Sequence, residues 1–173
     1  VINPMRERGW EEFVNPQNPV QMLTQRATKM SSLYLQPLPG GDIAAIAGII
    51  KAVYERSDVG EVVDRDFITE HTHGYEGFVD WIKLQSWDEL ERESGLTREQ
   101  MQDAGDIFAR SRRVMGIYGM GLTQHRLGVQ AVQMLMNLLL VGGHIGRPGA
   151  GICPVRGHSN VQGQRTVGVS SRP

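Results

Sequence analysis

The sequence predicts an α/β, Rossmann-like fold in which a mainly parallel sheet is flanked by helices. Short apolar segments are followed by glycine turns and then by amphipathic helices, the order typical of a parallel sheet. Twelve of the 21 glycines lie between Gly116 and Gly168, and the stretch from residue 143 onward has neither helical nor strand period. We therefore expect an α/β domain over residues 1–142 and a glycine-rich loop over residues 143–173.

Two strands and a long helix are expected first. The strand "VIN" ends at Pro4, because proline cannot continue a central ladder. Residues 6–32 are polar and weakly patterned, which indicates a long loop or a short helical excursion. A strand is expected in "SSLYLQPL", and "PGGD" then turns the chain into a helix with Asp42 as its N-cap. Its apolar face is formed by Ile43, Ile46, Ala47, Ile50, Val53 and Tyr54.

Capping signals mark two helices in the middle of the chain. Ser86 with Glu89 and Thr97 with Gln100 have the spacing of capping boxes, and Gly95 is placed to end the first helix. The second helix continues to about residue 110, and "RVMGIYGMG" follows as a short strand. Another helix, stopped by glycines 142 and 143, is predicted by the apolar stripe of Val129, Val132, Leu135, Met136, Leu139 and Leu140.

Composition excludes several function classes. A chain of 173 residues with 40% hydrophobic content suits one globular domain. The net charge of −1 argues against a nucleic-acid partner, and no apolar run approaches the length of a membrane helix. One cysteine excludes internal disulfides and fits a reducing compartment, so we expect a cytoplasmic protein. The chain begins at Val1 and stops at "SSRP", from which we expect a central piece of a longer protein.

Isolated histidines and the cysteine are predicted to have no chemistry of their own. His71 and His73 lack further ligands at metal-site spacing, so an ordinary surface pair is expected, and the same holds for His125 and His144. No metal ligand is assigned. Cys153 has no neighbouring C-x-x-C partner, which favours a buried structural thiol over a nucleophile.

Three segments are expected where a parallel sheet binds ligands, beyond the carboxyl ends of its strands. They are "INPMRE", "PLPGGDIA" and "YGMGLTQH". The second places backbone amides at a helix N-terminus, which favours an anion, although a plain capped turn has the same pattern. In the third, Thr123 and Gln124 offer groups that read a heterocycle edge, and a tight strand–helix turn is the alternative.

The stretch "GHIGRPGAGICPVRGHSNVQGQR", residues 143–165, points more firmly to a ligand. Its glycines allow close backbone approach, and its arginines, histidines and amides suit a pyrophosphate and a heterocycle. The alternative, a flexible tail, is typically built of Gly/Ser runs rather than of such diverse side chains. We expect residues 143–173 to be disordered without the ligand, because they have little apolar surface to bury.

The segment from "GMGLTQHRLGVQ" to "CPVRGHSNVQG" resembles the molybdopterin oxidoreductases, and "GRPGAG" with the following loop is most similar to the formate-dehydrogenase-alpha-like branch. "INPMRE" and "LPGGDIAAI" resemble two earlier motifs of the family, with Gly41 where threonine is usual. The resemblance implies a bis-molybdopterin guanine dinucleotide cofactor with molybdenum or tungsten. It also implies two-electron redox of a small substrate, and an electron-transfer partner subunit or protein.

Site residues follow from the matched motifs. The resemblance places Arg156 in the substrate pocket. His158 replaces the glutamine that formate dehydrogenases have there, and its imidazole is expected to be a proton-handling neighbour of Arg156. The implied cofactor contacts are Asn3, Gly40, Gly41, Asp42, Gly119, Met120, Gln124, Arg156, Gly157, Asn160, Gln162 and Gly163.

Some parts of the family pattern are missing from this chain. An iron–sulfur cluster of the 4Fe-4S type needs four cysteines, so the cluster is expected in the full-length protein and this piece alone is expected to be inactive. A non-catalytic nucleotide-binding or regulatory α/β module remains the alternative. A purely structural scaffold is a third, and it leaves the glycine-rich loop unexplained.

Overall fold

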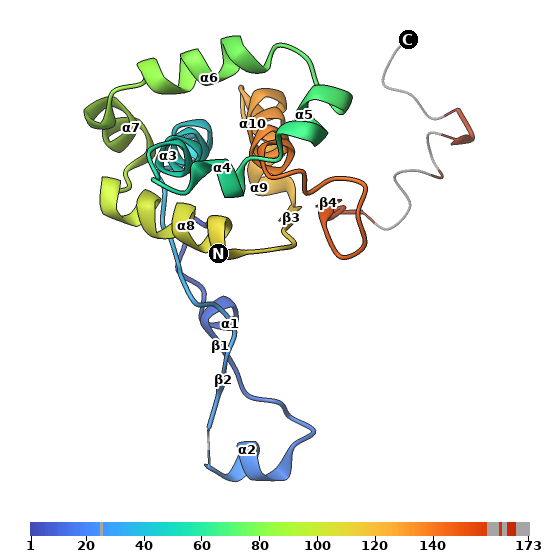
Figure 1. Ribbon diagram of the computed structural model, residues 1–173. Helices are drawn as coiled ribbons and strands as arrows, with labels where there is room; N and C mark the ends of the chain where they lie inside the picture. Colours follow the sequence, from blue (N-terminus) through green and yellow to red (C-terminus); the bar gives the residue numbers. More distant parts are fainter. Residues whose placement is uncertain (25, 159–162, 164–165, 169–173) are drawn as a thin grey trace.

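The computed structural model of the chain describes residues 1–24, 26–158, 163 and 166–168. A helical body carries a long arm that extends away from it (Figure 1). The described residues are mostly helical, with two small two-stranded sheets, of which one is parallel.

The centre of the body is α3 (Asp42–Tyr54), a helix buried on nearly all sides. Its sequence is almost wholly apolar, and a helix that is hydrophobic all round needs neighbours on every face. These neighbours are α6 (Tyr75–Leu84), α7 (Trp87–Ser94), α8 (Arg98–Arg110) and α10 (Gly128–Val141). The core therefore lies between helices, and the apolar face predicted from Ile43 to Tyr54 belongs to it.

The predicted helix boundaries are largely confirmed. The Ser86 hydroxyl accepts a hydrogen bond from the Glu89 N–H, and Thr97 and Gln100 form the reciprocal capping box. Gly95 ends α7 in the left-handed region with φ of 72°. The Asp42 prediction was wrong, because Gly41 is the N-cap and Asp42 is the first helical residue. Two short helices, α4 (Val59–Val62) and α5 (Arg65–His71), lie beside α10 and form a smaller apolar cluster with it.

A β-α-β unit forms the other side of the body. Strands β3 (Met115–Tyr118) and β4 (Gly151–Pro154) pair in parallel, and the crossover contains α9 (Met120–Thr123) and α10. Gly116 is buried under α10, where a Cβ would lie 3.1 Å from the Leu139 side chain. The opposite face of the pair is open among the described residues, with Met115 50% and Ile117 65% exposed.

The predicted Rossmann-like, mainly parallel sheet is not what the described residues form. The segments expected as the first two strands meet in one isolated parallel bridge between Ile2 and Leu35. Pro4 and Pro37, which have no amide hydrogen to donate, stand just beyond this bridge, so the ladder cannot lengthen in that direction. The α/β prediction therefore holds only for the β3–β4 unit.

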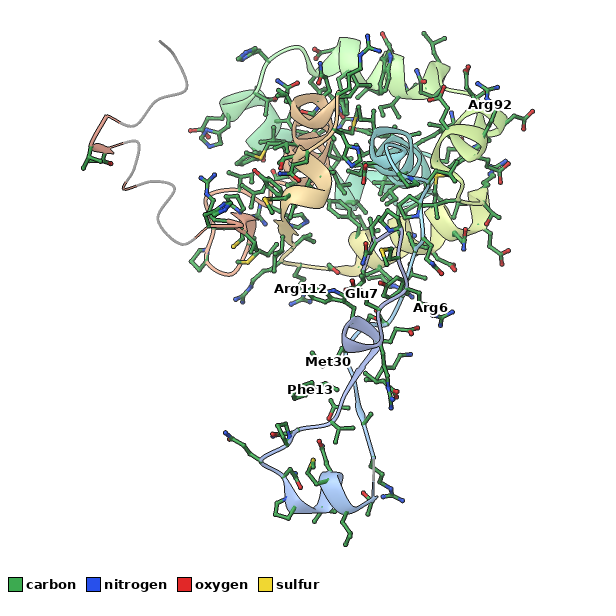
Figure 2. All side chains as sticks on the ribbon, turned by 180° about the vertical axis from the view of Figure 1, so that it is seen from behind. Arg6, Glu7, Phe13, Met30, Arg92 and Arg112 are labelled. Carbon is green, nitrogen blue, oxygen red and sulfur yellow. The ribbon has the colours of Figure 1, made fainter. Side chains whose placement is uncertain are left out.

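Residues 4–31 form most of the arm, which was expected to be a loop or a short helical excursion. It contains α1 (Arg8–Glu11), the antiparallel pair β1 (Glu12–Phe13) and β2 (Thr28–Lys29), and α2 (Pro19–Thr24). Its helices bury no residue, and the exposed side chains of Phe13 and Met30 project sideways from it (Figure 2). Within the described residues, no helix has both the length and the apolar character needed to cross a membrane.

Candidate functional site

The carboxyl edge of the β3–β4 pair brings together two of the predicted binding segments. The Val155 N–H donates to the Tyr118 carbonyl at 2.7 Å, which extends the pairing beyond β4. Two residues further along each segment, Gly157 lies beside Met120. A Cβ on Gly157 would lie 2.5 Å from the Met120 sulfur, so only glycine fits there without displacing Met120. Gly119 starts α9 beside the Val155 carbonyl. These contacts make one continuous edge from two distant parts of the chain.

Polar side chains surround this edge. The Gln124 amide donates to the Met120 sulfur at 3.6 Å, a weak contact on an exposed side chain. Arg156 and His158 flank Gly157, and both side chains are exposed. A guanidinium, an imidazole and an amide thus stand where a ligand lying across the strand ends has access to them.

The N-terminus of α3 is the second predicted segment. Gly40 turns the chain with φ of 86°, and a Cβ on the buried Gly41 would lie 2.6 Å from the Glu93 carbonyl. Asp42 is half-buried here, and burial raises the pKa of its carboxyl group. Its own N–H and the charge of His125, in the α9–α10 connection, act in the opposite direction. Asp42 therefore lies near the segment that follows α9, and its desolvated carboxylate gains from any hydrogen-bond donor that a ligand brings.

The remaining predicted contacts lie elsewhere. The Asn3 amide donates to the Tyr34 hydroxyl at 3.4 Å, and its N–H donates to the Leu35 carbonyl, at the base of the arm. Asn160 and Gln162 lie outside the described residues. The Gly163 carbonyl accepts a hydrogen bond from the Val167 N–H at 3.1 Å.

Two predictions about single residues were wrong. Cys153 is exposed, because it lies on β4 opposite Ile117, on the face of the strand pair that the described residues leave uncovered. His144 was expected at the surface and is buried, only 5% exposed. The His144 N–H donates to the Leu139 carbonyl at 2.8 Å, which continues the hydrogen bonds at the end of α10. The imidazole ring lies inside the helical body. His71 and His73 are exposed as expected.

The structure also reveals an ion pair that sequence reasoning missed. The Arg147 guanidinium donates to the Asp64 carboxylate at 2.7 Å, and Asp64 in turn caps α5 by accepting from the Phe67 N–H. The ion pair lies against Gly143, where a Cβ would be 2.5 Å from the Asp64 carboxylate. Arg147 and Asp64 are 83 positions apart, so no local pattern links them. Within the described ranges, no three His, Cys, Asp or Glu side chains are grouped to hold a metal ion.

Comparison with known proteins gives an independent result. No protein-family model matches the chain. Protein YdeP of Escherichia coli is 46% identical across the whole chain, and an uncharacterized oxidoreductase of Mycobacterium tuberculosis is 36% identical across 98% of it. The alpha subunit of an F420-dependent formate dehydrogenase from Methanocaldococcus jannaschii is 34% identical across 81% of it. The chain is homologous to a segment of each of these proteins.

The homologous segment is a small part of each relative. The chain spans 24% of YdeP, 22% of the mycobacterial oxidoreductase and 20% of the formate dehydrogenase alpha subunit. Its homologues include oxidoreductases, and formate dehydrogenase alpha subunits are among them. The oxidoreductase, formate-dehydrogenase-like character expected from the motifs is thereby supported at the level of homology.

Proposed function

We propose that the chain is a cofactor-binding segment of a molybdenum- or tungsten-dependent oxidoreductase that uses bis-molybdopterin guanine dinucleotide. The observation that carries the proposal is the shared carboxyl edge of β3 and β4, where Met120 contacts Gly157. Carboxyl edges of parallel strands are the usual ligand sites of α/β proteins. Homology to formate dehydrogenase alpha subunits supports the same cofactor class.

The residues at this edge fit a large, flat, phosphorylated cofactor. Gly119 and Gly157 leave the backbone bare, so that a ring system approaches closely. Gln124 offers two donors and an acceptor to the edge of a heterocycle, and Asn160 and Gln162 are assigned the same task. Gly40 and Gly41 lead into the start of α3, a 13-residue helix whose N-terminal dipole favours a pyrophosphate.

Asp42 is assigned the guanine base. Guanine carries two adjacent donor groups, N1–H and N2–H₂, which a carboxylate accepts in a bidentate arrangement. Burial leaves the ionised form of Asp42 poorly solvated, which raises the pKa of its carboxyl group, and guanine donors replace the lost water. Asn3 lies at the base of the arm, where its side-chain amide donates to the Tyr34 hydroxyl. It is assigned a contact with the same dinucleotide.

Arg156 and His158 are assigned to the substrate side. The exposed Arg156 guanidinium binds and orients an anionic substrate through charge-assisted hydrogen bonds. His158 accepts or donates a proton beside it, since an imidazole changes charge near neutral pH. When bound, the cofactor supplies two-electron transfer at its metal, and the protein orients it and tunes its electronics. A 4Fe-4S centre and an electron-transfer partner complete the proposed enzyme outside this chain.

Binding of GDP to the chain tests the guanine assignment. We expect Asp42→Asn to weaken GDP binding about tenfold, because a bidentate carboxylate contact to a base is worth roughly 1–3 kcal/mol. ADP, which has the same pyrophosphate and lacks the guanine donors, should bind weakly to both proteins. Isothermal titration calorimetry measures these affinities.

Asp88→Asn is the matched control, since Asp88 is an exposed carboxylate in the first turn of α7. Equal GDP affinity in the wild type and Asp42→Asn would contradict the assignment. Metal analysis of the protein from a molybdopterin-producing host distinguishes the enzyme from a nucleotide-binding module. Bound molybdenum or tungsten supports the enzyme, and GDP binding without either metal supports the module.

A further inference from the structure

A cleft of about 420 Å³ lies at the amino edge of the β3–β4 pair, away from the proposed cofactor site. Its walls come from the end of α8 and the residues before β3, from the end of α4 and Asp64, and from the turn between α10 and β4. The carboxyl edge, with Met120 and Gly157, is at the other end of the same strands. The amino and carboxyl ends of the two parallel strands lie at opposite ends of the pair. A ligand in this cleft is therefore separate from a cofactor bound at the carboxyl ends.

His144 lines this cleft and carries a buried polar atom that has no hydrogen-bond partner among the described residues. The residue is 95% buried, and its Nδ1 is the one buried side-chain nitrogen or oxygen without a hydrogen-bond partner in the described part of the chain. The ring is held edge-on against Phe108, with the ring centroids 5.1 Å apart, and it passes over Gly142, where a Cβ would lie 2.6 Å from Nε2. A buried polar group without a partner costs about 1–3 kcal/mol, so the site gains from a ligand that satisfies it.

The charges around His144 favour an anion. Arg110, Arg112 and Arg147 line the cleft together with Glu61 and Asp64. The Arg147–Asp64 ion pair neutralises one charge of each sign, which leaves two arginines against Glu61. Arg112 forms no hydrogen bond or ion pair within the described residues, and its guanidinium is exposed. The cleft thus combines a net positive wall with one fixed imidazole.

We propose that this cleft binds a small oxyanion, a phosphate or carboxylate group, between Arg112, Arg110 and the imidazole of His144. One oxygen of the anion hydrogen-bonds to the His144 ring, and the others face the two guanidinium groups. Chloride is a single atom and cannot contact the imidazole and the guanidinium groups through separate atoms. Phosphate and carboxylate groups, which have two or more oxygens, therefore fit the site better. The site depends on residues that the proposed cofactor does not touch, and it stands or falls independently of that proposal.

Side-chain ¹⁵N spectra of the histidines, recorded while inorganic phosphate and then acetate are added, test the proposal. We expect a saturable shift of the His144 imidazole resonances with at least one of these anions, and little shift with sodium chloride at equal ionic strength. Replacing Arg112 with glutamine should raise the apparent dissociation constant about fivefold, as expected for a partly exposed charge contact worth about 1 kcal/mol.

Arg92→Gln is the matched control. Arg92 is an exposed arginine on α7, and Figure 2 shows it well separated from Arg112. His144→Phe retains an aromatic ring beside Phe108 and should abolish phosphate binding measured by isothermal titration calorimetry, because this variant has no His144 resonance to follow. Arg112→Gln tests the proposal by both measurements if His144→Phe does not fold. Absence of a saturable shift with either anion, or equal weakening by Arg92→Gln and Arg112→Gln, would overturn the proposal.

Discussion

The surroundings of His144 make the stability of the chain depend on pH. Burial lowers the pKa of His144, and the nearby charge of Arg147 lowers it further, while Asp64 acts in the opposite direction. Glu61, Arg110 and Arg112 also line the cleft beside the ring. A histidine with a depressed pKa contributes stability that is present above its unfolded pKa and is lost as the pH falls through the folded value.

The first prediction is therefore a pH effect. Between about pH 7.5 and pH 5, we expect the free energy of unfolding to fall more steeply in the wild type than in His144→Phe, because phenylalanine has no proton to take up. Urea denaturation at each pH measures the difference. The exposed His73→Gln is the control and should follow the wild type; parallel curves for all three proteins would contradict the prediction.

Cys153 and His144 also mark what residue-level reasoning missed. Both were assigned a burial from residue type and sequence neighbours, and both assignments were wrong. Burial depends on which elements lie over a residue. The face of β4 that carries Cys153 is uncovered in the described chain, whereas Phe108 of α8 covers His144. Neither arrangement can be predicted from the residues adjacent in sequence to Cys153 or His144.

At the scale of single elements, two glycines inside helices allow the effect of helix propensity on stability to be distinguished from the effect of side-chain packing. Gly48 is in the middle of α3, where an added Cβ would clash with the sulfur of Met101, a side chain with no exposed surface. Gly77 is near the start of α6 and has no atom within 4 Å of the same position. Both are helical, so the two sites differ chiefly in the room around them.

The second prediction follows from this contrast. Gly77→Ala should stabilise the chain by about 0.5–1 kcal/mol through helix propensity. Gly48→Ala should destabilise it by roughly 1–2 kcal/mol, because overpacking a core costs more than the propensity gained. Chemical denaturation of both variants tests the pair, and stabilisation by Gly48→Ala would show that Met101 moves aside.

Helix boundaries were the part of the fold that sequence predicted best. The N-caps at Ser86 and Thr97, the stop at Gly95 and the extent of α8 and α10 agree with expectation, although among these described residues only Thr97 and Gln100 form the predicted reciprocal capping box. Each of these signals involves residues within about four positions of one another, so the local sequence contains all the partners. The N-cap of α3 was placed one residue late for a local reason too, since Gly41 and Asp42 are both acceptable there.

At the scale of the whole molecule, the arm and the body differ in how much they bury. α3 contributes nine buried residues to the core, whereas α1 and α2 contribute none. The arm is joined to the body near Tyr34, whose hydroxyl donates to the Met5 carbonyl at 2.7 Å and accepts from the Glu7 N–H. Local stability follows buried apolar contact, so the two parts should open at different free energies.

The third prediction concerns this difference. In hydrogen exchange measured by mass spectrometry, amides of α3 should exchange slowly, through opening close to global unfolding. Peptides that cover residues 8–29 should exchange orders of magnitude faster. Slow exchange in the arm would contradict this and would indicate that its exposed apolar side chains, such as Trp10 and Phe13, are covered in solution.

The sequence by itself determined the helices, their caps and stops, and the motifs that link the chain to formate-dehydrogenase-like oxidoreductases. Only the tertiary structure decided that a helix rather than a sheet occupies the core, that Met120 meets Gly157, and that His144 lies beside Arg147 and Asp64. The physical reason is range. Capping and helical periodicity act between neighbours in the chain, whereas strand pairing, burial and ion pairs join residues whose distance in sequence carries no information about their distance in space.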